Sequence, residues 1–152
     1  MVDQRTSAID ETIGLLFALM HGGRVAEAWV DGALEPVGLS ALQWFTLRQL
    51  VVAGGSLPLG QAAERLSCAK SNVTQLVDRL EREGLAVRVP DPLDRRSVFA
   101  QITDEGRRRY HAGERAIGDL GDVLDAALTP AVRDQLVQAL GRLDAGRPHS
   151  RG

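Results

Sequence analysis

The sequence has little cysteine and few aromatic residues, and each shortage excludes a class of protein. Cys68 is the only cysteine among 152 residues, which rules out an internal disulfide framework and any multi-cysteine zinc site. Aromatic residues make up 4% of the chain, so leucine, valine and alanine must supply most of the packing, and this composition favours helices. No apolar run reaches the roughly 18 to 20 residues that span a bilayer, and no signal-peptide core follows the first residues. We therefore expect a cytoplasmic protein without a membrane partner.

The net charge of -2 hides an uneven distribution of charge along the chain. Residues 40–115 carry 12 Lys or Arg against 9 Asp or Glu, whereas the flanking residues carry 6 against 11. A basic middle between acidic ends fits a region that binds a polyanion, although this excess alone is weak evidence.

Hydrophobic spacing and capping signals predict a mostly α (α+β) fold. The stripe from Ile9 to Met20 predicts a helix over about residues 8–33, with a bend at Gly22 and Gly23. Between Leu85 and Thr103 the pattern changes to two short strands, which form a hairpin with a basic tip. Further helices are predicted to begin near Ala41, with a Ser40/Gln43 capping box, at Pro58, at Ala69, after Thr103 and after Thr129.

This order of elements predicts a winged helix-turn-helix domain with a two-stranded wing. An α-helix fits the major groove of B-DNA, and a thin basic loop can enter the minor groove nearby. The alternative for the polar helix alone is an ordinary solvated face. With its apolar residues turned inward, this helix presents Lys70, Ser71, Asn72, Thr74, Gln75 and Arg79 as candidate DNA contacts.

The predicted helix and hairpin also carry a specific sequence pattern. Val77-Asp78-Arg79-Leu80 is followed by Asp91-Pro92-Leu93-Asp94-Arg95-Arg96 and then by Thr103-Asp104-Glu105-Gly106. This pattern resembles the MarR-type transcriptional regulators over about residues 39–106, and the helical flanks agree in number and order. The resemblance implies a homodimeric winged-helix regulator of transcription, a repressor or an activator with the repressor favoured, that binds a pseudo-palindromic DNA operator. It implies neither an enzyme nor a cofactor.

The resemblance also implies roles for individual residues. By this resemblance, residues 69–83 form the recognition helix, and Arg95 at the wing tip contacts the minor groove. Arg96 beside it is expected to have a more structural role than Arg95. Because carboxylates are poor neighbours for phosphate, Asp78 and Asp94 are interpreted as partners that orient the wing arginines. The usual serine cap of the recognition helix is replaced here by Ala69, and Ser67 or Ser71 can substitute for it, which leaves the start of this helix open.

The flanking helices have apolar stripes without an evident partner, which predicts a helical dimer interface. The expected organisation is a dimerisation helix in residues 1–36, the winged domain in 37–105, dimerisation helices in 106–145 and a flexible tail in 146–152. The family resemblance implies a small aromatic or phenolic effector where the dimer helices meet the winged domain. Candidate ligand-binding residues, each of which can instead serve packing, are Phe17, His21, Trp29, Trp44 and Phe45, with Arg24 and Tyr110.

Two other functions stay open at this stage. A winged-helix domain can serve protein–protein contact without DNA, although Lys70 and Arg95 argue against that use. Cys68 lies in the turn before the recognition helix, where oxidation would make a redox-responsive regulator, but a buried packing role is the alternative. Further arginines, which can contact phosphate or form ion pairs, are Arg48, Arg65 and Arg107 to Arg109.

Overall fold

The computed structural model describes residues 2–66, 70–91, 94 and 97–146. The predictions for Ser67, Cys68, Ala69, Arg95, Arg96 and the tail from residue 147 lie outside the described residues. The chain divides into two compact units, residues 1–117 and 118–152.

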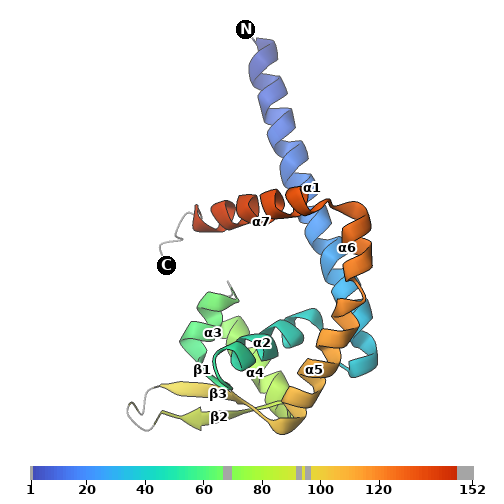
Figure 1. Ribbon diagram of the computed structural model, residues 1–152. Helices are drawn as coiled ribbons and strands as arrows, with labels where there is room; N and C mark the ends of the chain where they lie inside the picture. Colours follow the sequence, from blue (N-terminus) through green and yellow to red (C-terminus); the bar gives the residue numbers. More distant parts are fainter. Residues whose placement is uncertain (1, 67–69, 92–93, 95–96, 147–152) are drawn as a thin grey trace. The chain divides into compact units, whose positions relative to one another are not determined.

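The first unit is a helical domain with one small sheet (Figure 1). Its elements are α1 (Val2–Leu34), the 3-10 helix η1 (Glu35–Val37), α2 (Ala41–Val52), β1 (Ser56–Pro58), α3 (Leu59–Arg65), α4 (Lys70–Arg82), β2 (Ala86–Pro90), β3 (Val98–Ile102) and α5 (Asp104–Gly118). The second unit holds α6 (Gly121–Ala127) and α7 (Pro130–Ala145). The expected mostly helical winged helix-turn-helix arrangement is confirmed.

The sheet has three antiparallel strands in the order β1-β3-β2. The predicted hairpin corresponds to β2 and β3, whereas β1 was missed. Leu57 and Arg88 lie on either side of the fully buried Ala100, so β3 is the central strand. A three-residue strand that ends in proline gives no local strand signal, because its existence depends on pairing with a distant segment. Pro58 consequently belongs to β1 and is the N-cap of α3 rather than its first residue.

Capping signals in the sequence mark the observed helix ends. Ser40 and Gln43 form the predicted capping box at the start of α2, and the Thr129 hydroxyl accepts a hydrogen bond from the Val132 amide at the start of α7. Gly84 has φ of +71°, and the Leu85 amide donates to the Leu80 carbonyl at 2.8 Å, so α4 ends in a Schellman motif. The predicted helix starts at Ser40 and Thr129 are confirmed.

Two helix boundaries differ from the prediction. α1 begins at Val2 and runs without interruption past Gly22 and Gly23, so the helix is longer than predicted and is not broken there. In the C-terminal part of the chain, α5 ends at Gly118, and a separate helix, α6, begins at Gly121. The two glycines that bound this interval have low helix propensity, which favours a break in the helix there.

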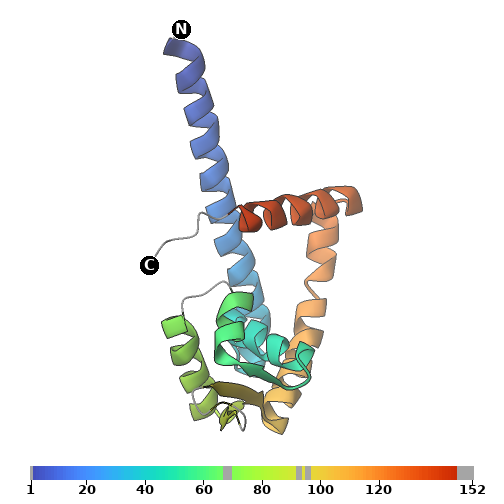
Figure 2. The same ribbon diagram turned by 90° about the vertical axis from the view of Figure 1, so that its left-hand side faces the viewer.

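The core of the first unit packs α4 against α3 and against strand β2 of the sheet (Figure 2). Val73, Val77 and Leu80 are at most 1% exposed, so one side of α4 is fixed inward and the opposite side must face outward. The remaining buried residues are mainly leucine, as the low aromatic content requires, and include Leu34, Leu39, Leu47, Leu50, Leu57, Leu85, Ala100 and Ile102, with Trp44 and Tyr110.

Candidate nucleic-acid interface

The outward face of α4 carries the predicted recognition residues. Positions 73, 76, 77 and 80 are buried, and the residues between them are exposed. A helix of 13 residues extends about 20 Å and is about 10 to 12 Å across with its side chains, so it fits a major groove about 12 Å wide. The structure thus gathers on one exposed face Ser71, Asn72, Thr74, Gln75, Asp78 and Arg79. The backbone of Lys70 begins the helix, and its side chain lies outside the described residues.

Part of this face borders a cleft that is shared with α2. The cleft has a volume of about 240 Å³ and is lined by Asn72, Gln75, Leu76 and Arg79 of α4 and by Leu42 of α2. The lining combines amide and guanidinium groups with the apolar side chains of Leu42 and Leu76, so the surface offers both hydrogen-bonding groups and apolar contact. These are the two kinds of interaction that base edges in the major groove accept.

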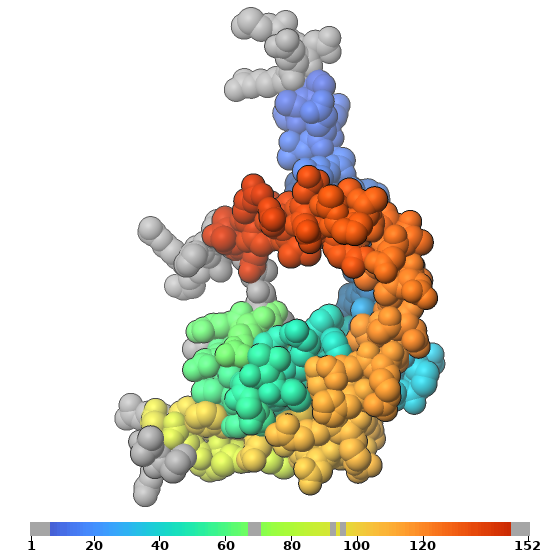
Figure 3. Space-filling view, viewed as in Figure 1, coloured from blue at the N-terminus to red at the C-terminus, as the bar shows by residue number. Residues whose placement is uncertain are grey.

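The wing is the hairpin formed by β2 and β3. It extends outward beyond the helices of the first unit in Figure 3, where the strands are yellow. Its loop is closed by backbone hydrogen bonds from the Asp91 amide to the Ser97 carbonyl at 3.0 Å and from the Ser97 amide to the Asp94 carbonyl at 2.8 Å. The tip arginines are outside the described residues, so the roles of Asp94, Arg95 and Arg96 stay predictions.

Asp78 contacts an arginine of the wing strand that the sequence analysis missed. Its Oδ1 lies 2.6 Å from Nη1 of Arg88, in β2. Glu81, one turn further along α4, accepts from both the backbone amide and the guanidinium of Arg88. A signal was present in the sequence: two acidic residues three positions apart on a helix, followed by a basic residue in the next strand.

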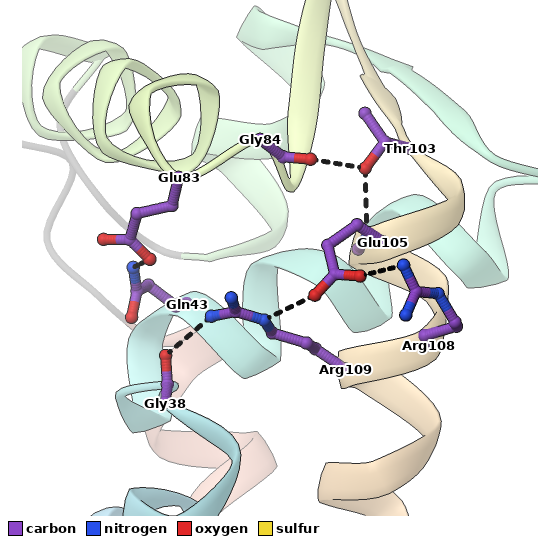
Figure 4. Close-up of polar contacts among 9 residues, drawn as sticks. Gly38, Gln43, Glu83, Gly84, Thr103, Glu105, Arg108 and Arg109 are labelled. Carbon is purple, nitrogen blue, oxygen red and sulfur yellow. Dashed lines mark hydrogen bonds and ion pairs between the residues drawn. The ribbon is translucent and has the colours of Figure 1, made fainter.

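The end of α4 is tied to neighbouring elements by polar contacts (Figure 4). Nε2 of Gln43 in α2 donates to Oε2 of Glu83 at 2.9 Å. The Thr103 hydroxyl donates to the Gly84 carbonyl at 2.7 Å and accepts from the Gly106 amide at 3.0 Å, so one side chain caps α5 and holds the turn after α4. These contacts fix the C-terminal end of the predicted recognition helix.

Two of the three consecutive arginines of α5 share one acidic partner, and the third lies elsewhere. Arg108 and Arg109 both form ion pairs with Glu105, and Arg109 also lies 3.5 Å from the Gly38 carbonyl (Figure 4). The Arg107 guanidinium lies over Gly55. Of the two roles considered for these arginines, phosphate contact and ion pairing, the structure shows ion pairing for Arg108 and Arg109, both with Glu105.

The candidate ligand-binding residues do not gather in one place. Trp44 is buried against the Tyr110 ring, whereas Phe17 and His21 stack on each other on an exposed face of α1, with 6.2 Å between ring centroids. Trp29 is also exposed. Phe45 lines a largely apolar cavity of about 320 Å³ between α1 and α2, together with Gly23, Ala26, Glu27, Val30, Ala41 and Leu42.

A hydrogen-bonded cluster joins two consecutive residues of α5 to Glu114. The Tyr110 hydroxyl donates to Oε1 of Glu114 at 2.6 Å, and Nδ1 of His111 lies 2.8 Å from Oε2. Burial, this hydrogen bond and the negative charge of Glu114 raise the pKa of Tyr110 to about 12. The hydrogen bonds from Tyr110 and His111 lower the pKa of Glu114. Tyr110 is therefore a neutral hydrogen-bond donor at physiological pH.

The described part of the chain offers no cluster of three His, Cys, Asp or Glu side chains that could hold a metal ion. Among the same residues, we find no helix long and apolar enough to cross a membrane.

Comparison with known sequences identifies close similarity to bacterial regulators. A model of the MarR family matches residues 37–97. The transcriptional activatory protein BadR of Rhodopseudomonas palustris is 40% identical over 145 residues, which cover 87% of this chain and 81% of BadR. Two Bacillus subtilis proteins match over shorter segments: the uncharacterized HTH-type transcriptional regulator YkoM (44% identical, 41% of this chain, 40% of YkoM) and the transcriptional repressor MdtR (36%, 56% of each). The chain thus spans less than two thirds of these two relatives.

Comparison with solved structures shows the same fold. Sco3205 from Streptomyces coelicolor, solved in complex with DNA, aligns with a TM-score of 0.83 at 21% identity over 93% of this chain and 94% of that one. A mutant of MarR from E. coli, complexed with operator DNA, aligns with a TM-score of 0.82 at 24% identity over 88% of this chain and 96% of that one. These relatives are transcription regulators rather than enzymes. With BadR matched over most of its length and an outward polar helix beside a wing, the chain belongs to the MarR family of transcriptional regulators.

Proposed function

We propose that the chain is a homodimeric repressor that binds a pseudo-palindromic DNA operator and is released by a small aromatic ligand. The observation that carries this proposal is the exposed polar face of α4, which lies beside an outward-extending hairpin. Two proteins of the same fold have been solved with DNA bound. Because chromosomal DNA is the partner, we place the protein in the cytoplasm.

Within this proposal, α4 lies in the major groove and reads base edges near its middle. Gln75 can donate to and accept from one adenine, and Thr74 offers a hydroxyl and a methyl group. Lys70, Ser71 and Asn72 occupy the first turn, where the free backbone amides of a helix favour a phosphate. Arg79 reaches the phosphate backbone. Arg95, with Arg96 beside it, inserts its permanently charged and weakly hydrated guanidinium into the minor groove.

Binding to selected DNA tests the contact made by the wing. Arg95→Ala should weaken binding to a duplex that the unmodified protein selects from a random library, and it should lower the salt dependence of the affinity. Arg115→Ala removes the same charge from the exposed end of α5 and serves as the matched control. An Arg95 variant with the affinity of the Arg115 variant would remove the minor-groove role. Failure of the unmodified protein to select any DNA would favour the protein–protein alternative.

Dimerisation is supported by apolar side chains that a single chain leaves exposed on both flanks. Phe17, on α1, is 66% exposed, an unusual position for a large apolar side chain. In a two-fold dimer, each copy of the chain can bury these apolar stripes against the same stripes of the other copy. The exposed residues are Ile9, Ile13, Leu15, Leu16, Phe17, Met20 and Trp29 on α1, Val123 and Leu124 on α6, and Val132, Leu136, Val137, Leu140 and Leu143 on α7.

Light scattering measures the oligomeric state directly. We expect a mass of twice the 16.4 kDa of the chain, and the spacing of the two half-sites in the selected DNA should be about 10 base pairs. A stable monomer, or a selected site without two-fold symmetry, contradicts the dimer.

The cavity between α1 and α2 is the proposed effector site. Its volume of about 320 Å³ is within the range of small-molecule pockets, and Phe45 and Val30 give it apolar walls beside the Glu27 carboxylate. A panel of phenols and benzoates should include a compound that raises the melting temperature and lowers DNA affinity. Phe45→Ala should abolish both effects of that compound. If peroxide, rather than any compound, releases the DNA and Cys68→Ser prevents this, the redox alternative replaces the ligand.

The direction of regulation follows from a reporter gene placed behind the selected operator. We expect lower expression when the regulator is present, since steric exclusion of polymerase needs DNA binding alone. Higher expression would instead assign an activator, as the name of BadR states for that relative.

A further inference from the structure

Arg88 of β2 reaches across to three residues of α4 at once. Its Nη1 contacts Oδ1 of Asp78 at 2.6 Å and also Oε2 of Glu81, and its Nη2 donates to the Thr74 carbonyl at 3.0 Å. Its backbone amide donates to Oε1 of Glu81 at 2.7 Å. These contacts span almost two turns of α4, and we refer to Arg88 with Thr74, Asp78 and Glu81 as the Arg88 cluster.

The cluster is geometrically restrictive because it uses a planar guanidinium and both oxygens of one carboxylate. Glu81 binds the side chain and the main chain of Arg88 together, so neither the strand nor the helix can rotate without breaking one of the two hydrogen bonds. The Arg88 side chain is 26% exposed, so solvent competes only in part for these contacts. Hydrogen bonds with charged groups are worth more than those between neutral groups.

The charges in the cluster argue against a direct contact between Arg88 and DNA. One guanidinium faces two carboxylates, so the cluster carries an excess of negative charge toward any phosphate. For Arg88 to reach a phosphate, it would have to give up both Asp78 and Glu81 and leave them beside a polyanion. The present contacts therefore suit a link inside the protein.

We propose that Arg88 is a positioning residue that fixes the direction of the β2–β3 wing relative to α4, so that helix and wing read one DNA half-site in a fixed register. The inference rests on the proposed function, because it requires that α4 and the wing contact the same DNA. It also gives Asp78 a role on an exposed helix face where a carboxylate would otherwise repel phosphate. Asp78 and Glu81 bind the guanidinium of Arg88, and Arg88 in turn fixes the direction of the wing.

The effect of losing this link differs between specific and non-specific DNA. A wing that is free to move must be ordered when it enters the minor groove beside a helix seated in the major groove, and this ordering reduces affinity for the matched site. Non-specific binding depends on phosphate contacts and needs no common register. Loss of Arg88 should therefore lower the affinity for the matched site and leave the affinity for non-specific DNA nearly unchanged, so that the protein discriminates less well between the two.

The experiment compares Arg88→Gln, Arg88→Lys and the charge control Arg115→Gln on two duplexes, the one selected by the unmodified protein and a scrambled duplex of equal length. Arg88→Gln should lower the affinity for the selected duplex by about tenfold and leave the affinity for the scrambled duplex at that of the control. Arg88→Lys keeps the charge but loses the fork, so it should behave like Arg88→Gln.

A double-mutant cycle with Glu81 tests whether Arg88 acts through its partners. Glu81→Gln alone should reproduce part of the loss, and Arg88→Gln with Glu81→Gln should lose no more than Arg88→Gln alone. Affinities are compared at temperatures where circular dichroism shows each variant folded, so that a stability change is not counted. Because a merely structural role leaves discrimination unchanged once the protein is folded, the ratio of the two affinities is the decisive readout.

Four results would overturn the inference. Equal discrimination by Arg88→Gln and the control removes the positioning role while the proposed function stands. Recovery of full affinity in Arg88→Lys, or equal losses on both duplexes with a salt slope reduced by about one, assigns Arg88 to a phosphate. Absence of selective binding by the unmodified protein overturns the proposed function and, with it, the inference.

Discussion

The Trp44 indole stacks on the Tyr110 ring, with 5.5 Å between the ring centroids and 19° between the planes. Nε1 of Trp44 also donates to the Tyr110 carbonyl at 3.1 Å, which satisfies the polar group of a buried indole. Gly113, one turn beyond Tyr110, allows this close approach of α2 and α5. A Cβ at Gly113 would lie 2.5 Å from Cδ1 of Trp44 and 2.8 Å from Cδ2 of Leu34.

Gly113→Ala should destabilise the protein although alanine is the better helix former. Helix propensity favours the alanine by about 1 kcal/mol, but the displaced indole costs about 1 to 3 kcal/mol. Thermal unfolding should show a lower melting temperature. Gly60→Ala in α3, where an added Cβ meets nothing within 4 Å, is the control and should be neutral or slightly stabilising. A Gly113 variant as stable as the Gly60 variant would show that the indole can move freely.

Tyr110 should ionise far above the usual pH range. It is the single tyrosine of the chain, so the ultraviolet absorbance of phenolate reports on it alone. Burial, the hydrogen bond to Glu114 and the charge of that carboxylate raise its pKa from 10.0 to about 12, against the opposing charge of Arg48. The midpoint should lie near pH 12 in the folded protein. In Glu114→Gln it should fall but stay above 10.0, because burial is the largest cause.

The same shift makes stability depend on pH in a defined window. Tyr110 is protonated in both states below pH 10, so its stabilising contribution is complete there. As the pH rises from 10 to about 12, the unfolded chain loses the phenolic proton before the folded one does, and stability falls. Tyr110→Phe should remove this part of the pH dependence in urea unfolding. An identical slope in the variant would mean that another group titrates.

The Thr103 hydroxyl serves two elements, so its removal should cost more than an ordinary helix cap. Thr103→Ala loses the hydrogen bonds to the Gly106 amide and the Gly84 carbonyl, and we expect a loss of about 1 to 2 kcal/mol in the free energy of unfolding. Thr103→Ser keeps the hydroxyl and should retain most of the stability. If serine is as damaging as alanine, the methyl group rather than the hydroxyl is responsible.

Gln75 and Thr74 should determine base preference at defined operator positions. Selection from a random library with Gln75→Ala should relax the preference at one position in each half-site and preserve the rest, since each bidentate base contact discriminates by about 1 to 3 kcal/mol. Glu64→Gln, on α3, is a control expected to keep every preference. A uniform loss at all positions with Gln75→Ala would reassign that residue to the phosphate backbone.

The features that were predictable from sequence are those made by neighbours along the chain. Ser40, Thr103 and Thr129 cap helices through backbone groups within three residues, and Gly84 ends α4 because its φ of +71° suits glycine. The outward face of α4 was also predictable, since a helical period fixes which side chains oppose a buried stripe. Both kinds of signal are local.

The features that were missed depend on distant partners. β1 is three residues long and exists because it pairs with β3, more than 40 positions away. Arg88 is close in sequence to Asp78 and Glu81, but its guanidinium contacts depend on how β2 crosses α4, which the acidic and basic spacing alone does not fix. For Trp44 the sequence leaves both ligand binding and packing open, because its burial against Tyr110 depends on the packing of α2 on α5.

The contrast between the two tryptophans gives the molecule a pair of internal optical probes. Trp44 is 6% exposed in the core, and Trp29 is 43% exposed on α1. A collisional quencher such as iodide will therefore reach the emission of Trp29 and leave that of Trp44. If the chain assembles through α1, iodide should quench the Trp29 emission less as the protein concentration rises. The Trp44 emission should stay protected from iodide as long as the domain that carries α4 is folded.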